Sequence, residues 1–86
     1  MPTISVFFGI VIRMFYNDHA PPHFHAEYGG DKAAIRIDTL EVLEGRLPRR
    51  ALELVSDWAE LHRAELLANW DLCRSHQQPR KIEPLS

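Results

Sequence analysis

The chain has 86 residues, of which 45% are hydrophobic and 26% are charged, and its formal net charge is −2. These values are typical of an ordinary soluble globular protein, and we expect a single domain over residues 1–86 with a core of modest size. Because 10 basic residues are offset by 12 acidic ones, the overall charge implies no general attraction to nucleic acid. The single cysteine, Cys73, excludes an internal disulfide and a multi-cysteine zinc site. Such cysteine usage fits a reducing cytoplasm.

The N-terminal segment, residues 1–16, is apolar but lacks the features of a targeting or membrane segment. No basic region precedes it, no small-residue cleavage site follows it, and it is too short to span a bilayer. We therefore expect an extended segment in a cytoplasmic protein that does not enter a membrane. Residues 10–16 follow Gly9 and are β-branched and aromatic, which predicts a strand.

Two further strands are predicted over residues 23–28 and 32–38, joined by the turn signal Gly29-Gly30. The run 39–44, ended by Gly45, either adds a short fourth strand or belongs to a connection. Alternation then sorts the side chains onto two faces of an antiparallel sheet. The core face is expected to carry Ile10, Ile12, Met14, Phe24, Ala26, Tyr28, Ala33, Ile35 and Ile37. The opposite, polar face is expected to carry Arg13, His23, His25, Glu27, Arg36 and Asp38.

From Pro48 to His76 the sequence has a helical pattern. Its buried stripe recurs every three or four residues, at Ala51, Val55, Trp58, His62, Leu66, Trp70 and Cys73. A straight helix over 48–76 would measure ~43 Å, which exceeds the ~30 Å diameter of a small domain. We therefore expect either a bend near residues 62–65 or a helix end that extends to a partner. The tail, residues 77–86, contains two prolines and is expected to be loose.

These elements predict an α+β fold. A three- or four-stranded antiparallel sheet in the N-terminal half would be covered on one face by a long, bent C-terminal helix or by a helix pair. The polar face of that sheet is either an ordinary solvated face, as antiparallel sheets commonly have, or a functional surface.

Three of the five histidines lie in the run Asn-Asp-His-Ala-Pro-Pro-His-Phe-His, residues 17–25. The prolines prevent a helix, so His23 and His25 would share one face of an extended strand. Together with His19 they can supply three ligands to a divalent metal such as zinc or nickel. Alternatively, Asp18 and His19 form an acid–base pair, because histidine changes charge near neutral pH. The simpler interpretation is that these imidazoles only shape the turn and bond to the neighbouring strand.

A second group of candidates, Arg46, Arg49 and Arg50, surrounds the predicted start of the helix. Cations there oppose the helix dipole, so their presence fits the binding of an anion such as a nucleic-acid phosphate. The simpler interpretation pairs Arg49 and Arg50 with Glu53. No nucleophile setting or phosphate-binding glycine loop is present in the sequence, which favours a binding role over an enzyme.

The same residues carry a resemblance to a known family. The segments FFGIVIRMFYNDHAPPHFHAEYG, EGRLPRRAL and WAELHRAELLANW resemble the bacterial domain-of-unknown-function family numbered 4160, and the resemblance extends over residues 1–84. Members of that family often lie beside another small uncharacterised domain, an arrangement similar to the two-gene organisation of toxin–antitoxin modules. The resemblance implies one fold and a cytoplasmic location, and it supplies no substrate. It points to Asp18, His19, Pro21, Pro22, His23 and His25.

Three hypotheses for function follow. The first is a small bacterial binding module, toxin–antitoxin-like, that acts through a protein partner or through self-association along the helical stripe, with nucleic acid as a further ligand. Arg13, His23, His25 and Arg36 on the polar face would contribute to its binding surface. The second is a metal-dependent or acid–base enzyme that uses the histidine cluster. The third is a pH-responsive surface on which protonated His23 and His25 meet an acidic partner.

Overall fold

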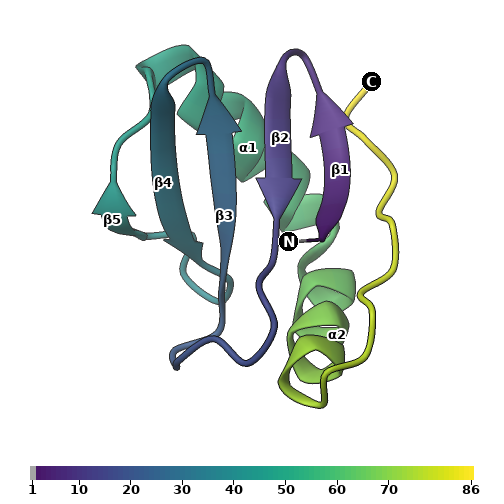
Figure 1. Ribbon diagram of the computed structural model, residues 1–86. Coiled ribbons are helices and arrows are strands. Elements are labelled where there is room, and N and C mark those ends of the chain that lie inside the picture. The colour runs from purple at the N-terminus through teal and green to yellow at the C-terminus, as the bar shows by residue number, and fades with distance from the viewer. Residues whose placement is uncertain (1) are drawn as a thin grey trace.

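The computed structural model describes residues 2–86 and contains one antiparallel sheet followed by two helices (Figure 1). The elements are β1 (Thr3–Phe7), β2 (Ile10–Arg13), β3 (His23–Tyr28), β4 (Asp31–Arg36), β5 (Val42–Gly45), α1 (Arg49–Leu61) and α2 (Arg63–Arg74). The strands are neighbours in the sheet in the same order as in the sequence, so the sheet is a meander. The α+β class is confirmed, with five strands where three or four were expected.

The additional strand, β1, precedes the first strand that we predicted. Phe8 and Gly9 separate it from β2 in a tight turn, and both have positive φ angles, 50° and 77°. Two-residue hairpins require this conformation, and Phe7 and Ile10 pair directly beside the turn. Glycine signals such a turn but phenylalanine does not, so Gly9 indicated only the start of the next strand and not a hairpin.

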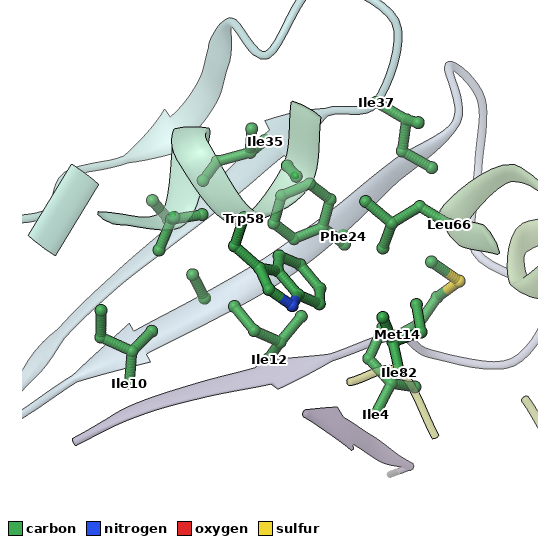
Figure 2. Close-up of a cluster of buried hydrophobic side chains, with 14 of the residues drawn as sticks. Ile4, Ile10, Ile12, Met14, Phe24, Ile35, Ile37, Trp58, Leu66 and Ile82 are labelled. Atoms are coloured by element: carbon green, nitrogen blue, oxygen red, sulfur yellow. The ribbon is translucent and has the colours of Figure 1, made fainter. Parts of the chain in front are cut away.

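The hydrophobic core lies between the sheet and α1, which crosses behind the strands in Figure 1. Trp58 is fully buried at its centre, and its ring centroid lies 5.3 Å from that of Phe7 and 5.9 Å from that of Phe24. Figure 2 shows this indole among side chains from four strands, α2 and the C-terminal segment. The residues predicted for the core face are buried except Tyr28, which is largely exposed. Tyr28 is the last residue of β3, beside the turn at Gly29.

The helical stripe is buried in this same core. Its members from Ala51 to Cys73 are buried, apart from the half-buried His62. The stripe is therefore covered by the chain's own sheet and is not a surface for self-association. Only scattered apolar side chains of the helices, such as Leu61 and Leu67, are exposed.

The helical segment bends at His62, whose φ and ψ are −121° and 23°. The bend was one of the two expected solutions, and two contacts accompany it. His62 Nδ1 lies 2.6 Å from Glu65 Oε1, and Arg63 Nε donates to the Ile37 carbonyl oxygen at 3.0 Å. The second contact attaches the start of α2 to the chain just after β4. Neither α1 nor α2, the helices found within residues 2–86, is long and apolar enough to cross a membrane.

The C-terminal segment, residues 77–86, packs along the fold and is not loose as expected. Ile82 is buried in the core, and the Trp58 Nε1–H donates to the Glu83 carbonyl oxygen at 2.9 Å. The buried Asn69 amide bonds to both backbone groups of Arg80, at 2.9 Å each. The segment runs beside β1 in Figure 1. Its prolines and charged residues resemble those of a flexible tail, and only the tertiary contacts distinguish it from one.

Candidate functional site

The histidine-rich segment converges on the carboxylate of Asp18. Oδ2 of Asp18 lies 3.0 Å from Nε2 of His23 and 3.1 Å from Nε2 of His25. Oδ1 accepts the backbone N–H of His19 at 2.9 Å. One ligand atom from each of Asp18, His23 and His25 lies within 4.8 Å of the other two. The loop before β3 and the start of β3 therefore form one polar cluster, which we call the Asp18 cluster.

Two packing contacts hold the imidazoles of the Asp18 cluster from outside. The His25 ring centroid lies 4.3 Å from that of Phe15, in the β2–β3 loop. The His23 ring centroid lies 5.2 Å from that of Trp70 on α2. The same loop is bonded to α2 by the Asn17 N–H, which donates to the Cys73 carbonyl oxygen at 3.1 Å. The second helix therefore positions a site that lies far away in the sequence.

His23 is only 4% exposed, which corrects its predicted place on a solvated sheet face. Trp70 covers it, and strand alternation within residues 23–28 could not reveal that contact. His23 Nδ1 lies 2.7 Å from the Pro21 carbonyl oxygen. Because a carbonyl oxygen only accepts hydrogen bonds, Nδ1 carries a proton and donates it. The opposite nitrogen, Nε2, faces the Asp18 carboxylate, which has no proton to donate when ionised.

The Asp18 carboxyl is ionised at neutral pH. Burial raises its pKa, but the hydrogen bond from His25, the backbone N–H of His19 and the charges of His23 and His25 together hold the pKa below its ordinary value. An ionised carboxylate accepts hydrogen bonds or binds a cation. Asp18 can therefore accept hydrogen bonds or bind a cation, and the acid–base pair of Asp18 and His19 stays a prediction.

His19 lies outside the convergent set. Its side chain is 83% exposed, and its Nδ1 lies 3.1 Å from Oδ1 of Asp18, the oxygen that points away from the other two imidazoles. The structure thus brings His23 and His25 together with Asp18, and it does not assemble His19, His23 and His25 as a set. A metal ion bound here would take its third ligand from Asp18 and not from His19.

A shallow groove leads to the Asp18 cluster across the uncovered face of the sheet. One cavity of about 210 Å³ is lined by the cluster together with Ala34, Leu43 and Glu44. A neighbouring cavity of about 220 Å³ shares His25, Ala34 and Glu44 and adds Lys32. Glu44 and Lys32 were not among the site residues predicted from the sequence. Glu44 reaches this groove because β5 pairs it with Ala34, and no short-range signal predicts that register.

The arginines predicted on the polar sheet face are engaged in ion pairs. Arg13 Nε lies 3.4 Å from Glu27 Oε2. Arg36 Nε lies 2.5 Å from Asp38 Oδ1, and this hydrogen bond raises the pKa of Arg36 and lowers that of Asp38. Both arginines follow the predicted alternation, but neither contacts the Asp18 carboxylate.

The other three arginines surround the start of α1, as predicted. Arg49 and Arg50 extend into solvent and approach the Glu53 carboxylate at 4.0 Å and 3.7 Å, which is the pairing of the simpler interpretation. Arg46 follows β5, and its backbone N–H donates to the Lys32 carbonyl oxygen at 2.9 Å. Exposed ion pairs between arginine and glutamate contribute little to stability. The guanidinium groups of Arg49 and Arg50 therefore remain accessible to other anions.

A protein family described as a domain of unknown function (DUF4160) matches residues 9–71. The chain belongs to this family. The match includes β2 to β5, the Asp18 cluster and most of α2, whereas β1 and the C-terminal segment lie outside it. No curated protein and no solved structure matches the chain. The match confirms the expected family membership. The description of the family names no activity for the DUF4160 domain.

Proposed function

We propose that this DUF4160 chain is a small binding module of the bacterial cytoplasm, toxin–antitoxin-like, that recognises a protein partner at the β5 edge of its sheet. The observation that carries the proposal is the difference between the two edges. The β1 edge is accompanied by the C-terminal segment, whose Ile82 N–H donates to the Ile4 carbonyl oxygen. All four residues of β5 are exposed, and β5 has a neighbouring strand on one side only.

An edge strand without a neighbour offers backbone N–H and C=O groups to a strand of another chain. Natural proteins commonly protect such an edge with lysine or proline, and β5 has the sequence Val-Leu-Glu-Gly. Val42 and Leu43 are 36% and 38% exposed, so apolar contact would add to the backbone pairing. Glu44 gives the edge a negative charge that suits a partner strand with a basic side chain.

Other binding modes have less support. Self-association along the helical stripe would require residues that are buried in the core. Nucleic acid would have to use Arg46, Arg49 and Arg50, two of which already approach Glu53. We therefore favour a protein partner and treat nucleic-acid binding as an outcome of the test.

The test uses the product of the gene beside this one, because the two-gene organisation that the family resemblance implies would make that product the expected partner. The two proteins are co-expressed and the complex is measured by size-exclusion chromatography. We expect the double substitution Val42→Lys and Leu43→Lys to weaken the complex at least ~10-fold, since lysine blocks strand addition. The matched control is Leu61→Lys, which changes a 72% exposed leucine on α1 and should leave the complex intact.

Two further measurements complete the test. Amide hydrogen exchange of residues 42–45 should slow on binding, and growth arrest by one of the two products should be relieved by the other. If no complex forms, or if the edge variant binds like the wild type, the proposal is overturned. A gel shift with nucleic acid that Arg49→Glu and Arg50→Glu abolish would instead support the nucleic-acid mode.

A further inference from the structure

We propose that Asp18, His23 and His25 form a binding site for a divalent first-row transition metal ion such as zinc. Two imidazoles and one carboxylate are a ligand set that proteins use for these metals when coordination positions are left open for water or substrate. The three ligands come from the β2–β3 loop and β3, although Leu43 and Glu44 of β5 line the cavity beside them. The test below therefore uses the chain without a partner, so that its outcome is separate from that of the proposed partner surface.

The distances within the Asp18 cluster already suit a metal. The Asp18 Oδ2 atom lies 3.0 Å and 3.1 Å from the two Nε2 atoms. A metal with bonds of ~2.1 Å keeps neighbouring ligand atoms ~3.0 Å apart in octahedral geometry and ~3.4 Å apart in tetrahedral geometry. The two carboxylate–imidazole distances therefore suit an ion, and one ligand atom of each residue lies within 4.8 Å of the other two.

Two of the three ligands, His23 and Asp18, have outer contacts that are typical of a metal site. A metal-bound histidine usually donates its other ring N–H to a carbonyl or carboxylate, which fixes its tautomer. His23 does so through Nδ1 and the Pro21 carbonyl oxygen at 2.7 Å, and the lone pair of Nε2 then points into the cluster. Asp18 Oδ1 is likewise held by the His19 backbone N–H, and this orients Oδ2 toward the two imidazoles.

The facing atoms of the cluster are placed so that one metal ion would bind all three ligands. Because Nδ1 of His23 donates to the Pro21 carbonyl oxygen, its other ring nitrogen, Nε2, faces Oδ2 of Asp18 at 3.0 Å. Nε2 of His25 lies 3.1 Å from the same oxygen. An ion placed among these atoms would be bound by both imidazoles and by the carboxylate.

The cavity that the Asp18 cluster itself lines provides room for the remaining coordination positions of an ion. Its volume of about 210 Å³ is lined by the three proposed ligands and by Glu44, so water or a small polar ligand can reach an ion held there. Glu44 is a positioning group for such a ligand and is not part of the convergent set.

The test uses untagged protein stripped of metal and titrated with Zn²⁺ in competition with a chromophoric chelator. We expect one ion per chain, and we expect Asp18→Asn and His25→Gln each to weaken binding at least ~10-fold, because each removes a ligand. His25 and Asp18 are preferred to the buried His23 because their substitution disturbs the core less. The matched control is His76→Gln, which removes an exposed histidine after α2 and should bind Zn²⁺ like the wild type.

Two measurements make the result independent of variant folding. Co²⁺ bound to the wild type should give visible d–d absorption, and Zn²⁺ should shift the ¹⁵N resonances of Nε2 in His23 and His25 while Nδ1 of His23 stays protonated. If the wild type binds neither ion at micromolar concentration, or if both ligand variants bind Zn²⁺ as the wild type does, the site is not a metal site.

Discussion

Ile82 donates its backbone N–H to the carbonyl oxygen of Ile4 at 2.8 Å, which joins the C-terminal segment to β1. The Ile82 side chain is buried in the core. We expect Ile82→Ala to lower the free energy of unfolding by about 2–5 kcal/mol, since it leaves a cavity among well-packed side chains. Urea denaturation followed by tryptophan fluorescence measures this loss. Glu83→Ala is the control, because Trp58 bonds to the Glu83 backbone carbonyl, and a loss as large as that of Ile82→Ala would contradict the proposed packing.

Asn69 provides a second attachment for the same segment. Its buried side-chain amide donates to the Arg80 carbonyl oxygen and accepts the Arg80 N–H. We expect Asn69→Leu, which is similar in volume, to cost about 1–3 kcal/mol because it leaves backbone polar groups without partners. Limited proteolysis should also cleave near Arg80 faster in this variant. The exposed Gln78→Ala should stay within about 0.5 kcal/mol of the wild type, and equal stability of the two variants would refute the role of Asn69.

Gly45 ends β5 where the chain passes close to β4. Its φ is +73°, and an added Cβ would overlap the Lys32 carbonyl oxygen. We expect Gly45→Ala to destabilise the protein by about 2 kcal/mol or more, from the strained φ angle and the clash with backbone together. Gly30→Ala is the matched control, since an added Cβ there meets nothing within 4 Å. Thermal unfolding compares the two variants, and similar melting temperatures would be inconsistent with this geometry.

Cys73 should be unreactive in the folded protein. Burial raises the pKa of its thiol, so less of the reactive thiolate is present at any given pH. We expect the native protein to react with a disulfide reagent at pH 8 at least ~10-fold more slowly than the urea-denatured chain. Absorbance of the released thiol chromophore follows both rates. Equal rates would show that the end of α2 opens readily.

Much of the fold could be predicted from local patterns. Turn residues at Gly29 and alternation over 23–28 and 32–38 are short-range signals, and they predicted the central hairpin of β3 and β4. The length of the helical pattern predicted either a bend near residues 62–65 or a helix end that extends to a partner, and the structure has the bend at His62. The β1–β2 hairpin was missed because Phe8 occupies a positive-φ position, and the order of the C-terminal segment depends on contacts with residues far away in the sequence.

The residues of the candidate site could be predicted from the sequence, but their arrangement around Asp18 could not. Residues 18–25 were selected as a cluster, and alternation placed His23 and His25 on the same side of a strand. The central position of Asp18 could not be predicted, because it depends on how the proline-containing loop turns. The exposure of His19 and the burial of His23 depend on the same loop and on the docking of Trp70.

The contacts between the β2–β3 loop and α2 also determine when the site is completed. Residues 17–25 leave the ribosome long before Trp70 and Cys73, which cover His23 and bond to Asn17. A nascent chain halted within α1 would contain Asp18, His23 and His25 without the helix that holds them. The cluster therefore gains the support of Trp70 and Cys73 only after α2 has been synthesised, so the complete site requires both halves of the chain.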